Sequence, residues 1–427
     1  MKQIFILFSV VLYSHSIITL PFQRIFDDEI ITNETFYKNY IDNKIYSKIN
    51  IGSSNTQIDL QIKFNQYSFC VRNDSTYCFN NSITYISNEE KDVFVYSTDF
   101  KYFIKSNETF IIGNEKIKID NTYFLLTKES TYKSDGILGL QIYDSGGKAK
   151  GYSLIPQLKN RKLIKKESFF FSFDKNSNNG ELIIGDYPHF IDKYKDIYHE
   201  EQFKVSCIYI PSCDQNFDLR FRRVSWNGSE FESLNIGHLK IESGLIVGTL
   251  KFCDISWDFF GPHFRKGRCQ RVDLSVFYEA YICDDYEEFD ITKFPSINFY
   301  ISDADYNLEL TYEDLFVKKN GKYYFMVCFD KKRPNVNWEL GNIFFKRNML
   351  VFDIDRKIIG IYNKTIQLNQ VSSDTMIWLL YIIIFAIVAV FALVVFIIIK
   401  LFYGKRPKKA YELDDDYEYK TNIIIND

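Results

Sequence analysis

Apolar and polar residues alternate in many short segments of this chain, and clusters of Asn, Ser, Asp and Gly separate the segments. Alternation with a period of two is typical of half-buried, antiparallel β-strands. Long helical periodicity is scarce outside one apolar stretch near the end, and no tandem repeat of fixed period is visible. Solenoids and propellers are therefore not expected. The strand-like segments include IDLQIKF, DVFVYS, ETFIIG, SFFFSF, ELIIG, SINFYI and YYFMVCF.

The most turn-rich stretch near the middle of the chain is DKNSNNGELIIGD, around Asn176–Gly185. A run of Asn, Ser and Gly between apolar segments suits either a hairpin or a boundary between two lobes. We expect an all-β fold with an amino-terminal β lobe over residues 38–186 and a carboxy-terminal β lobe over residues 187–366.

Residues 1–16 have the pattern of a secretory signal peptide. One lysine precedes an uninterrupted apolar run, Ile4–Leu12, and small residues follow at Ser14 and Ser16. An amphipathic helix of the mature fold is the alternative, but the run has no polar face. We therefore expect cleavage directly after residue 16.

A second apolar segment, residues 376–399, predicts a transmembrane helix. Its stretch Ile377–Ile399 contains no charged residue, glycine or proline, and a helix of that length measures roughly 34 Å, enough to cross a bilayer. The preceding flank has no basic residue, whereas Lys400, Lys405, Arg406, Lys408 and Lys409 follow the segment. The positive-inside rule places the tail, residues 400–427, in the cytosol and the large amino-terminal part in the lumen or outside the cell.

Charge and histidine content narrow the functional classes. Lys and Arg total 52 against 55 Asp and Glu in 427 residues, so no global field recruits nucleic acid. The five histidines share no spacing that suits a metal site, and we expect neither a metal nor a cofactor. They are His15, His189, His199, His238 and His263.

Cysteines and sequons agree with a secreted or lumenal domain. Cysteines in an oxidising compartment are better interpreted as disulfide partners than as metal ligands. Asn-X-Ser/Thr sequons would be accessible to the glycosylation machinery there. The eight cysteines are Cys70, Cys78, Cys207, Cys213, Cys253, Cys269, Cys283 and Cys328, and the sequons begin at Asn33, Asn73, Asn80, Asn107, Asn227 and Asn363.

Several blocks resemble one family, in that family's order. WELGNIFFKRNMLVFDIDRKIIGI, at Trp338–Ile361, resembles the carboxy-terminal signature of pepsin-like aspartic proteases. SDGILGL, at Ser134–Leu140, resembles the equivalent element of the amino-terminal lobe, and FFFSFDKNSNNGELIIGD resembles the strand pair that closes that lobe. The blocks span roughly residues 40 to 365. The resemblance implies a bilobal, pepsin-like double β-barrel.

The first active-site block of that family aligns without a gap to Ile51–Val71. In this alignment Lys63 takes the place of the catalytic aspartate, and Phe64, Asn65 and Gln66 replace the Thr-Gly-Ser of the turn. Such enzymes need two carboxylates about 3 Å apart that share one proton. Asp59 lies four residues before Lys63 on the strand, about 13 Å away, which is too far to substitute.

Two further positions follow from the same resemblance. GLIVGTLKFC, compared with the second active-site block, puts Gly248 on the second aspartate and keeps Thr249. VFVYSTDF resembles the family's flap and puts Tyr96 on the flap tyrosine, but Ser97 and Asp99 replace glycines that let the hairpin bend. Tyr96 as a simple cross-strand packing residue remains the alternative.

The resemblance also implies two disulfides, Cys70 with Cys78 and Cys283 with Cys328, at places where the family often carries them. Proximity in the sequence suggests Cys207 with Cys213 and Cys253 with Cys269, although eight cysteines allow 105 pairings.

Three functions are compatible with the chain. The first is a catalytically inactive, pepsin-fold, single-pass membrane glycoprotein that binds a peptide or protein ligand in its interlobe cleft. The second is a divergent but active aspartic endopeptidase, and the third is a structural or adhesive surface protein without a ligand cleft. Two carboxylates within about 4 Å at the floor of the cleft would favour the second.

Overall fold

The computed structural model describes residues 17–24, 36, 37, 40, 44–64, 66, 68–74, 76–91, 104–127, 134–141, 151–174, 179–207, 217–331, 337–362, 394, 395 and 397. The chain divides into two compact units, Met1–Lys364 and Thr365–Asp427. The predicted signal peptide and tail lie outside the described residues, as does most of the predicted membrane segment. Within the described ranges, no helix has the length and apolar character needed to span a bilayer.

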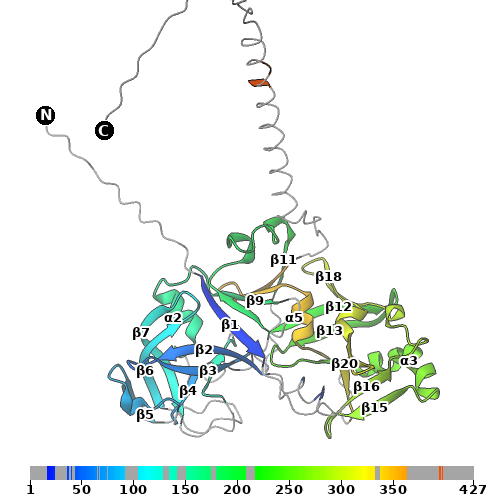
Figure 1. Cartoon of the computed structure of the whole chain (residues 1–427), viewed down its shortest axis with the longest axis horizontal. Helices are drawn as coiled ribbons and strands as arrows, with labels where there is room; N and C mark the ends of the chain where they lie inside the picture. Colours follow the sequence, from blue (N-terminus) through cyan, green and yellow to red (C-terminus); the bar gives the residue numbers. More distant parts are fainter. Residues whose placement is uncertain are drawn as a thin grey trace, which may run out of the picture. The chain divides into compact units, whose positions relative to one another are not determined.

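The first unit contains a 13-stranded sheet that draws strands from both ends of that unit (Figure 1). The amino-terminal strand β1 pairs with β10 and β2, and the carboxy-terminal β22 pairs with β9. The first and last strands of the unit are therefore held in one sheet. The order is β11 (Phe203–Cys207), β23 (Ile358–Tyr362), β22 (Leu350–Asp353), β9 (Ser168–Phe173), β10 (Gly180–Ile184), β1 (Ile18–Arg24), β2 (Ile45–Ile51), β3 (Thr56–Lys63), β8 (Gly136–Gly139), β4 (Phe69–Arg72), β7 (Ile117–Thr127), β6 (Ile104–Ile112) and β5 (Ile86–Lys91).

A second sheet of 10 strands is built entirely from the later part of the unit. Its order is β15 (Cys269–Asp273), β16 (Tyr278–Asp284), β20 (Lys322–Asp330), β14 (Ile246–Gly248), β21 (Trp338–Leu340), β13 (Ser229–Leu239), β12 (Asp218–Trp226), β17 (Ile297–Ile301) and β18 (Tyr306–Leu310), with β19 (Phe316–Lys319) paired to β20. The expected alternation is visible in β17, where Ile297, Phe299 and Ile301 are buried and the residues between them are half-buried.

Helices are few and short in the described residues. The longest, α3 (Leu250–Arg265), starts at Thr249, whose side chain accepts a hydrogen bond from the backbone N–H of Phe252. The others are α2 (Leu154–Asn160), α4 (Tyr312–Leu315) and α5 (Asn342–Arg347), and 3-10 turns lie at Phe79–Asn81, Pro188–Phe190, Glu200–Gln202 and Ile291–Lys293. The prediction of a strand-rich chain is confirmed.

Aromatic rings form much of the core and connect the two sheets. The Phe64 ring lies 5.0 Å from that of Phe217 and 5.1 Å from that of Phe352. Phe169 stacks on Phe352 at 4.9 Å. Because these residues come from widely separated parts of the chain, their packing fixes the turn after β3 against the carboxy-terminal strands.

The two sheets repeat one local topology. In the first sheet β3 runs parallel to β8, β8 is antiparallel to β4, and β4 is parallel to β7. In the second sheet β13 runs parallel to β21, β21 is antiparallel to β14, and β14 is parallel to β20. This repeat gives each residue near the turns after β3 and β13 a topological counterpart in the other sheet.

Candidate functional site

The two repeated turns have equal lengths. Gln61 on β3 pairs with Ile137, which pairs in turn with Cys70 on β4. His238 on β13 pairs with Glu339, which pairs with Val247 on β14. In each sheet, the two residues that pair with the same middle-strand residue are therefore nine positions apart in the sequence. The two turns can be compared position by position.

This comparison makes Lys240 the counterpart of Lys63. Lys63 is the partner of Gly139 at the end of the β3–β8 ladder. Lys240 directly follows the pair of Leu239 and Leu340, and its backbone N–H donates to the carbonyl of Leu340 at 3.0 Å. Each lysine is thus the first residue of its turn, and a glycine occupies the corresponding position on the neighbouring strand.

The glycines at these positions, Gly139 and Gly341, allow the turns to pack closely. A Cβ atom on Gly139 would lie 2.4 Å from the carbonyl oxygen of Gln66. A Cβ atom on Gly341 would lie 2.1 Å from the carbonyl oxygen of Leu245 and 2.6 Å from that of Ser243. No larger residue fits at either position without moving backbone.

The structure places Gly248 outside this second turn. Gly248 is the last residue of β14, and Thr249 after it begins α3. The register of β13 and β21 therefore assigns the counterpart of Lys63 to Lys240, eight residues earlier in the sequence. Asn65 and the predicted flap residue Tyr96 lie outside the described residues.

A carboxylic acid that the sequence analysis missed lies in the second turn. Glu242, Ser243 and Gly244 follow Lys240 by two residues and have the order acid, hydroxyl, glycine. That order is similar to the Asp-Thr-Gly of the family's active-site turns, so the sequence did contain a pattern that indicates this turn. The Ser243 hydroxyl holds the turn, because it donates to the carbonyl of Leu245 at 3.0 Å.

Glu242 lies at the junction of the two turns. Burial raises the pKa of its carboxyl group above the ordinary value, whereas hydrogen bonds from its own backbone and from that of Phe64, and the charges of Lys240 and Lys63, oppose the rise. Its Oε2 atom is buried and has no hydrogen-bond partner among the described residues. Glu242 is therefore a desolvated carboxyl group on which the charges of two ammonium groups act.

The two lysines are held differently. Lys63 is only 6% exposed. Lys240 forms an ion pair of 2.7 Å with Glu339, which lies beside it on β21. The charges that act on the Glu242 carboxyl are those of the Lys240 and Lys63 ammonium groups, and they favour its ionised form. A pair of carboxylates that shares one proton would instead need a second carboxylate beside Glu242.

An earlier segment of the chain packs on the second sheet next to this turn. The Tyr37 side chain is fully buried, and its hydroxyl donates to the carbonyls of Tyr281 at 2.8 Å and Phe325 at 2.9 Å. The Phe36 ring stacks on Tyr324 at 3.9 Å. These two side chains belong to one buried cluster with Leu245, Val247, Val272, Ala280, Ile282, Tyr324, Met326 and Cys328.

The same segment contacts the turn itself. The backbone N–H of Gly244 donates to the carbonyl of Tyr40 at 2.6 Å. Leu245 and Val247, on either side of Ile246, belong to the cluster that covers Tyr37. Part of the surface beside Glu242 is therefore occupied by the protein's own chain.

The disulfide pattern differs from the prediction. Cys269 and Cys283 face each other on the antiparallel strands β15 and β16 and are bonded, with Cα atoms 4.1 Å apart. The predicted pairs Cys253 with Cys269 and Cys283 with Cys328 are therefore wrong. Cys328 is a buried thiol on β20, and its Sγ donates to the carbonyl of Ile246 at 3.5 Å.

The other predicted pairs are not formed in the structure. Cys70 is buried and Cys78 half-buried, and both are free thiols. Cys70 lies within β4, which pairs with β8 on one side and β7 on the other. Cys207 is free and exposed, and its predicted partner Cys213 lies outside the described residues.

The sequons occupy different environments. Asn80 and Asn227 are exposed and Asn73 is half-buried, whereas Asn33 and Asn363 lie outside the described residues. Asn107 is only 8% exposed, on the paired strand β6. A glycan on Asn107 does not fit this fold, because the side chain is almost fully buried. In the described part of the chain, no group of three His, Cys, Asp or Glu residues could hold a metal ion.

Comparisons with known proteins agree with the repeated topology. The family model for eukaryotic aspartyl protease matches residues 44–364. The fold is similar to the solved structure of the aspartic proteinase from Irpex lacteus, with a TM-score of 0.60 and 15% identity over 83% of this chain and 99% of that chain. It is also similar to basic 7S globulin from soybean, with a TM-score of 0.59 and 14% identity over 81% of this chain and 95% of that chain.

No curated protein sequence matches the chain. The two similar structures have low identity, so they establish an all-β, pepsin-like fold and not an activity. The family model covers well over half of the sequence. This chain therefore belongs to the eukaryotic aspartyl protease family.

Proposed function

We propose that the protein is a non-proteolytic member of this family that acts as a binding protein. The observation that carries the proposal is the pair Lys63 and Lys240, which enter the two equivalent turns. Proteolysis by this fold needs two carboxylates that share a proton, so that one activates water while the other polarises the scissile carbonyl. Ammonium groups cannot take either role.

The remaining acid does not replace the pair. Glu242 is a single carboxyl group, and the charges acting on it come from lysines. The segment around Tyr37 and Tyr40 also covers the surface next to the turn. One of the two similar structures is named a globulin and not a proteinase, which supports the view that this fold serves more than one function.

The test is a cleavage assay with the purified protein and a diverse peptide pool from about pH 3 to 7, where such a carboxylate pair would operate. We expect no cleavage, and no binding of pepstatin, whose central hydroxyl is recognised by the two carboxylates. Cleavage that pepstatin inhibits, and that persists after contaminating proteases are removed, would contradict the proposal.

Proteolysis is the second candidate, and one observation favours it. Glu242, Ser243 and Gly244 keep the order acid, hydroxyl, glycine, and burial raises the pKa of the Glu242 carboxyl. An enzyme of this kind would lose all cleavage in the Glu242→Gln variant. Cleavage that Glu242→Gln leaves unchanged would instead come from another protein in the preparation.

We also propose that the protein is a single-pass membrane glycoprotein with a lumenal or extracellular amino-terminal part. The apolar segment at residues 376–399 and the basic residues after it support this topology. Protease treatment of sealed vesicles should remove only the tail, residues 400–427. Digestion of the amino-terminal part with protection of the tail would reverse the orientation.

A further inference from the structure

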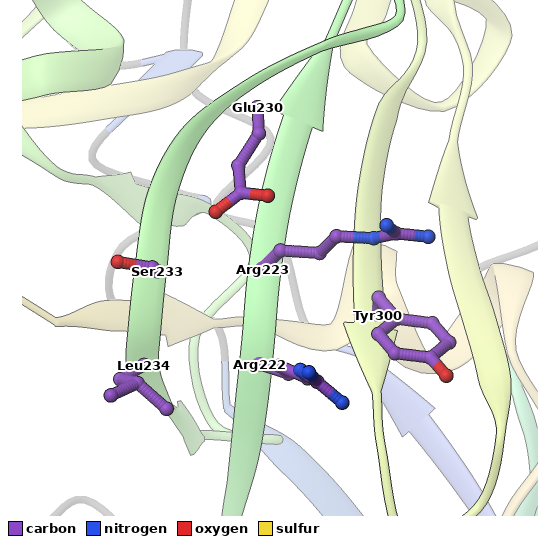
Figure 2. A pocket seen from close by; sticks show the side chains of 6 residues that line it. All are labelled: Arg222, Arg223, Glu230, Ser233, Leu234 and Tyr300. Atoms are coloured by element: carbon purple, nitrogen blue, oxygen red, sulfur yellow. The ribbon is translucent and has the colours of Figure 1, made fainter.

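A groove of about 650 Å³ lies on the second sheet, over the hairpin of β12 and β13 and the neighbouring strand β17 (Figure 2). None of its lining residues belongs to the turns that hold Lys63 and Glu242. The groove is lined by Arg222, Arg223, Glu230, Ser233, Leu234 and Tyr300.

Two consecutive arginines contribute to this groove although neighbours on a strand normally point to opposite faces. Arg222 and Arg223 are both exposed, while the flanking Phe221 and Val224 are buried. Phe221 pairs with Asn235 and Arg223 with Ser233, so Arg222 lies opposite Leu234. A local break in the alternation therefore brings both arginines to the surface.

Leu234 marks that break. Its φ of 52° is in the left-handed region, which is costly for a residue with a Cβ atom. Its side chain is 69% exposed. Non-glycine residues held in this region often occur at binding sites, where the surrounding structure maintains the strain. Leu234 thus offers an apolar contact surface beside two cationic groups.

Neither arginine of the groove has an anionic partner in the part of the chain that the structure describes. The Arg223 guanidinium lies 4.6 Å from the centre of the Tyr300 ring, and the charges of Arg222 and Arg223 both act on the Tyr300 hydroxyl. Figure 2 shows both guanidinium groups on the Tyr300 side of the groove. Neither arginine has a carboxylate within ion-pair distance among the described residues, and Glu230 is the one acid that lines the groove.

We propose that this groove binds an acidic segment of a partner polypeptide, with a carboxylate on Arg222 and Arg223 and an apolar side chain on Leu234. Guanidinium groups present paired N–H donors that match the two oxygens of a carboxylate. Stacking on Tyr300 orients Arg223 before the ligand arrives, which reduces the entropy lost on binding. The exposed Leu234 favours a peptide over a sulfated polysaccharide, which has no apolar side chain to place there.

The binding test uses the purified full chain in detergent and a fluorescein-labelled hexapeptide of alternating Glu and Leu, measured by fluorescence anisotropy at low salt. We expect saturable binding that the double variant Arg222→Gln/Arg223→Gln weakens by about tenfold or more, since charge-assisted hydrogen bonds are lost. The matched control is Arg265→Gln/Arg268→Gln, which removes the same charge and also includes a stacked arginine, Arg268 over Tyr286. The control should bind within about twofold of the wild type.

Leu234→Asn tests the apolar contact without straining the backbone, because Asn tolerates the left-handed conformation. This variant should weaken binding of the Glu-Leu peptide and leave heparin binding unchanged. Absence of saturable peptide binding would overturn the proposal, and so would equal losses in the two arginine double variants. Heparin binding that needs Arg222 and Arg223, without peptide binding, would identify a polysaccharide site and also overturn it.

Discussion

The ring of Phe64, directly after β3, lies 5.0 Å from the ring of Phe217, directly before β12, and this contact joins the turn after β3 to the second sheet. The Phe64 ring is buried among core aromatic side chains. The first turn is therefore fixed by aromatic packing. In the second turn, the charges of Lys240 and Lys63 oppose the rise that burial causes in the pKa of Glu242.

Glu242→Gln should change the pH dependence of stability. Burial raises the pKa of Glu242 above its ordinary value of 4.5 in the folded protein. The folded state then binds the proton more tightly than the unfolded state, so this group's contribution to stability falls as pH rises from about 4.5 through the folded pKa. Glutamine does not ionise, so the free energy of unfolding of the variant, relative to wild type, should increase between about pH 4 and 8.

Urea denaturation at a series of pH values measures this difference. Glu287→Gln is the control, because Glu287 is exposed, and its curve should run parallel to that of the wild type. A Glu242→Gln curve that also runs parallel would show that Glu242 has the same pKa in the folded and unfolded states.

Tyr37→Phe should destabilise the protein by about 1–2 kcal/mol. The Tyr37 hydroxyl donates to the carbonyls of Tyr281 and Phe325, and its removal leaves two buried acceptors without this donor. Tyr123→Phe is the control, since Tyr123 is 43% exposed, and it should change stability by less than about 0.5 kcal/mol. Equal stability of the two variants in urea denaturation would mean that the segment around Tyr37 does not pack as described.

Alternation of apolar and polar residues predicted the strands well where one face is buried. IDLQIKF overlaps β3, where Ile58, Leu60 and Ile62 are buried, and SINFYI contains β17, where Ile297, Phe299 and Ile301 are buried. The carboxy-terminal block of the resemblance contains β21, α5, β22 and most of β23. Local pattern is sufficient for such elements, because burial of one face determines both the side-chain period and the fold class.

The second turn could not be placed in the same way. The match of Thr249 to the family's second active-site block placed Gly248 on the second aspartate. The counterpart of Lys63 is determined instead by the pairing of β13 with β21, and that pairing joins residues about one hundred positions apart. The packing of Tyr37 was also missed, since the sequence around it has no periodicity. Long-range register and side-chain docking depend on the assembled fold and leave little local signal.

The disulfide between Cys269 and Cys283 should be detected by peptide mapping under non-reducing conditions. The bond closes a loop with a sequence separation of 14, so its loss in Cys269→Ala/Cys283→Ala should cost about 3 kcal/mol of stability. Cys253→Ala, which removes a free thiol, is the matched control and should keep the cross-linked peptide. A peptide that joins Cys283 to Cys328 would contradict the β15–β16 pairing.

Glycans should be found on Asn227 and be absent from Asn107 when the protein is secreted or purified from membranes. Asn227 lies at the tip of the β12–β13 hairpin, between Trp226 and Gly228, and is exposed. Asn107 pairs with Ile86 and Tyr123 on the strands to either side, and its Oδ1 atom is buried without a hydrogen-bond partner among the described residues. A glycan there would require the segments that cover this face of β6 to move, because the Asn107 side chain is only 8% exposed.

Mass spectrometry of peptides treated with an endoglycosidase that leaves one sugar residue measures occupancy at each sequon. Asn227→Gln should remove one glycan without changing thermal stability, because the side chain lies at an exposed turn. Asn107→Gln should leave the glycan mass unchanged and lower stability, since a longer side chain must fit a buried site. A glycan found on Asn107 of folded protein would show that this side chain is accessible and contradict its burial.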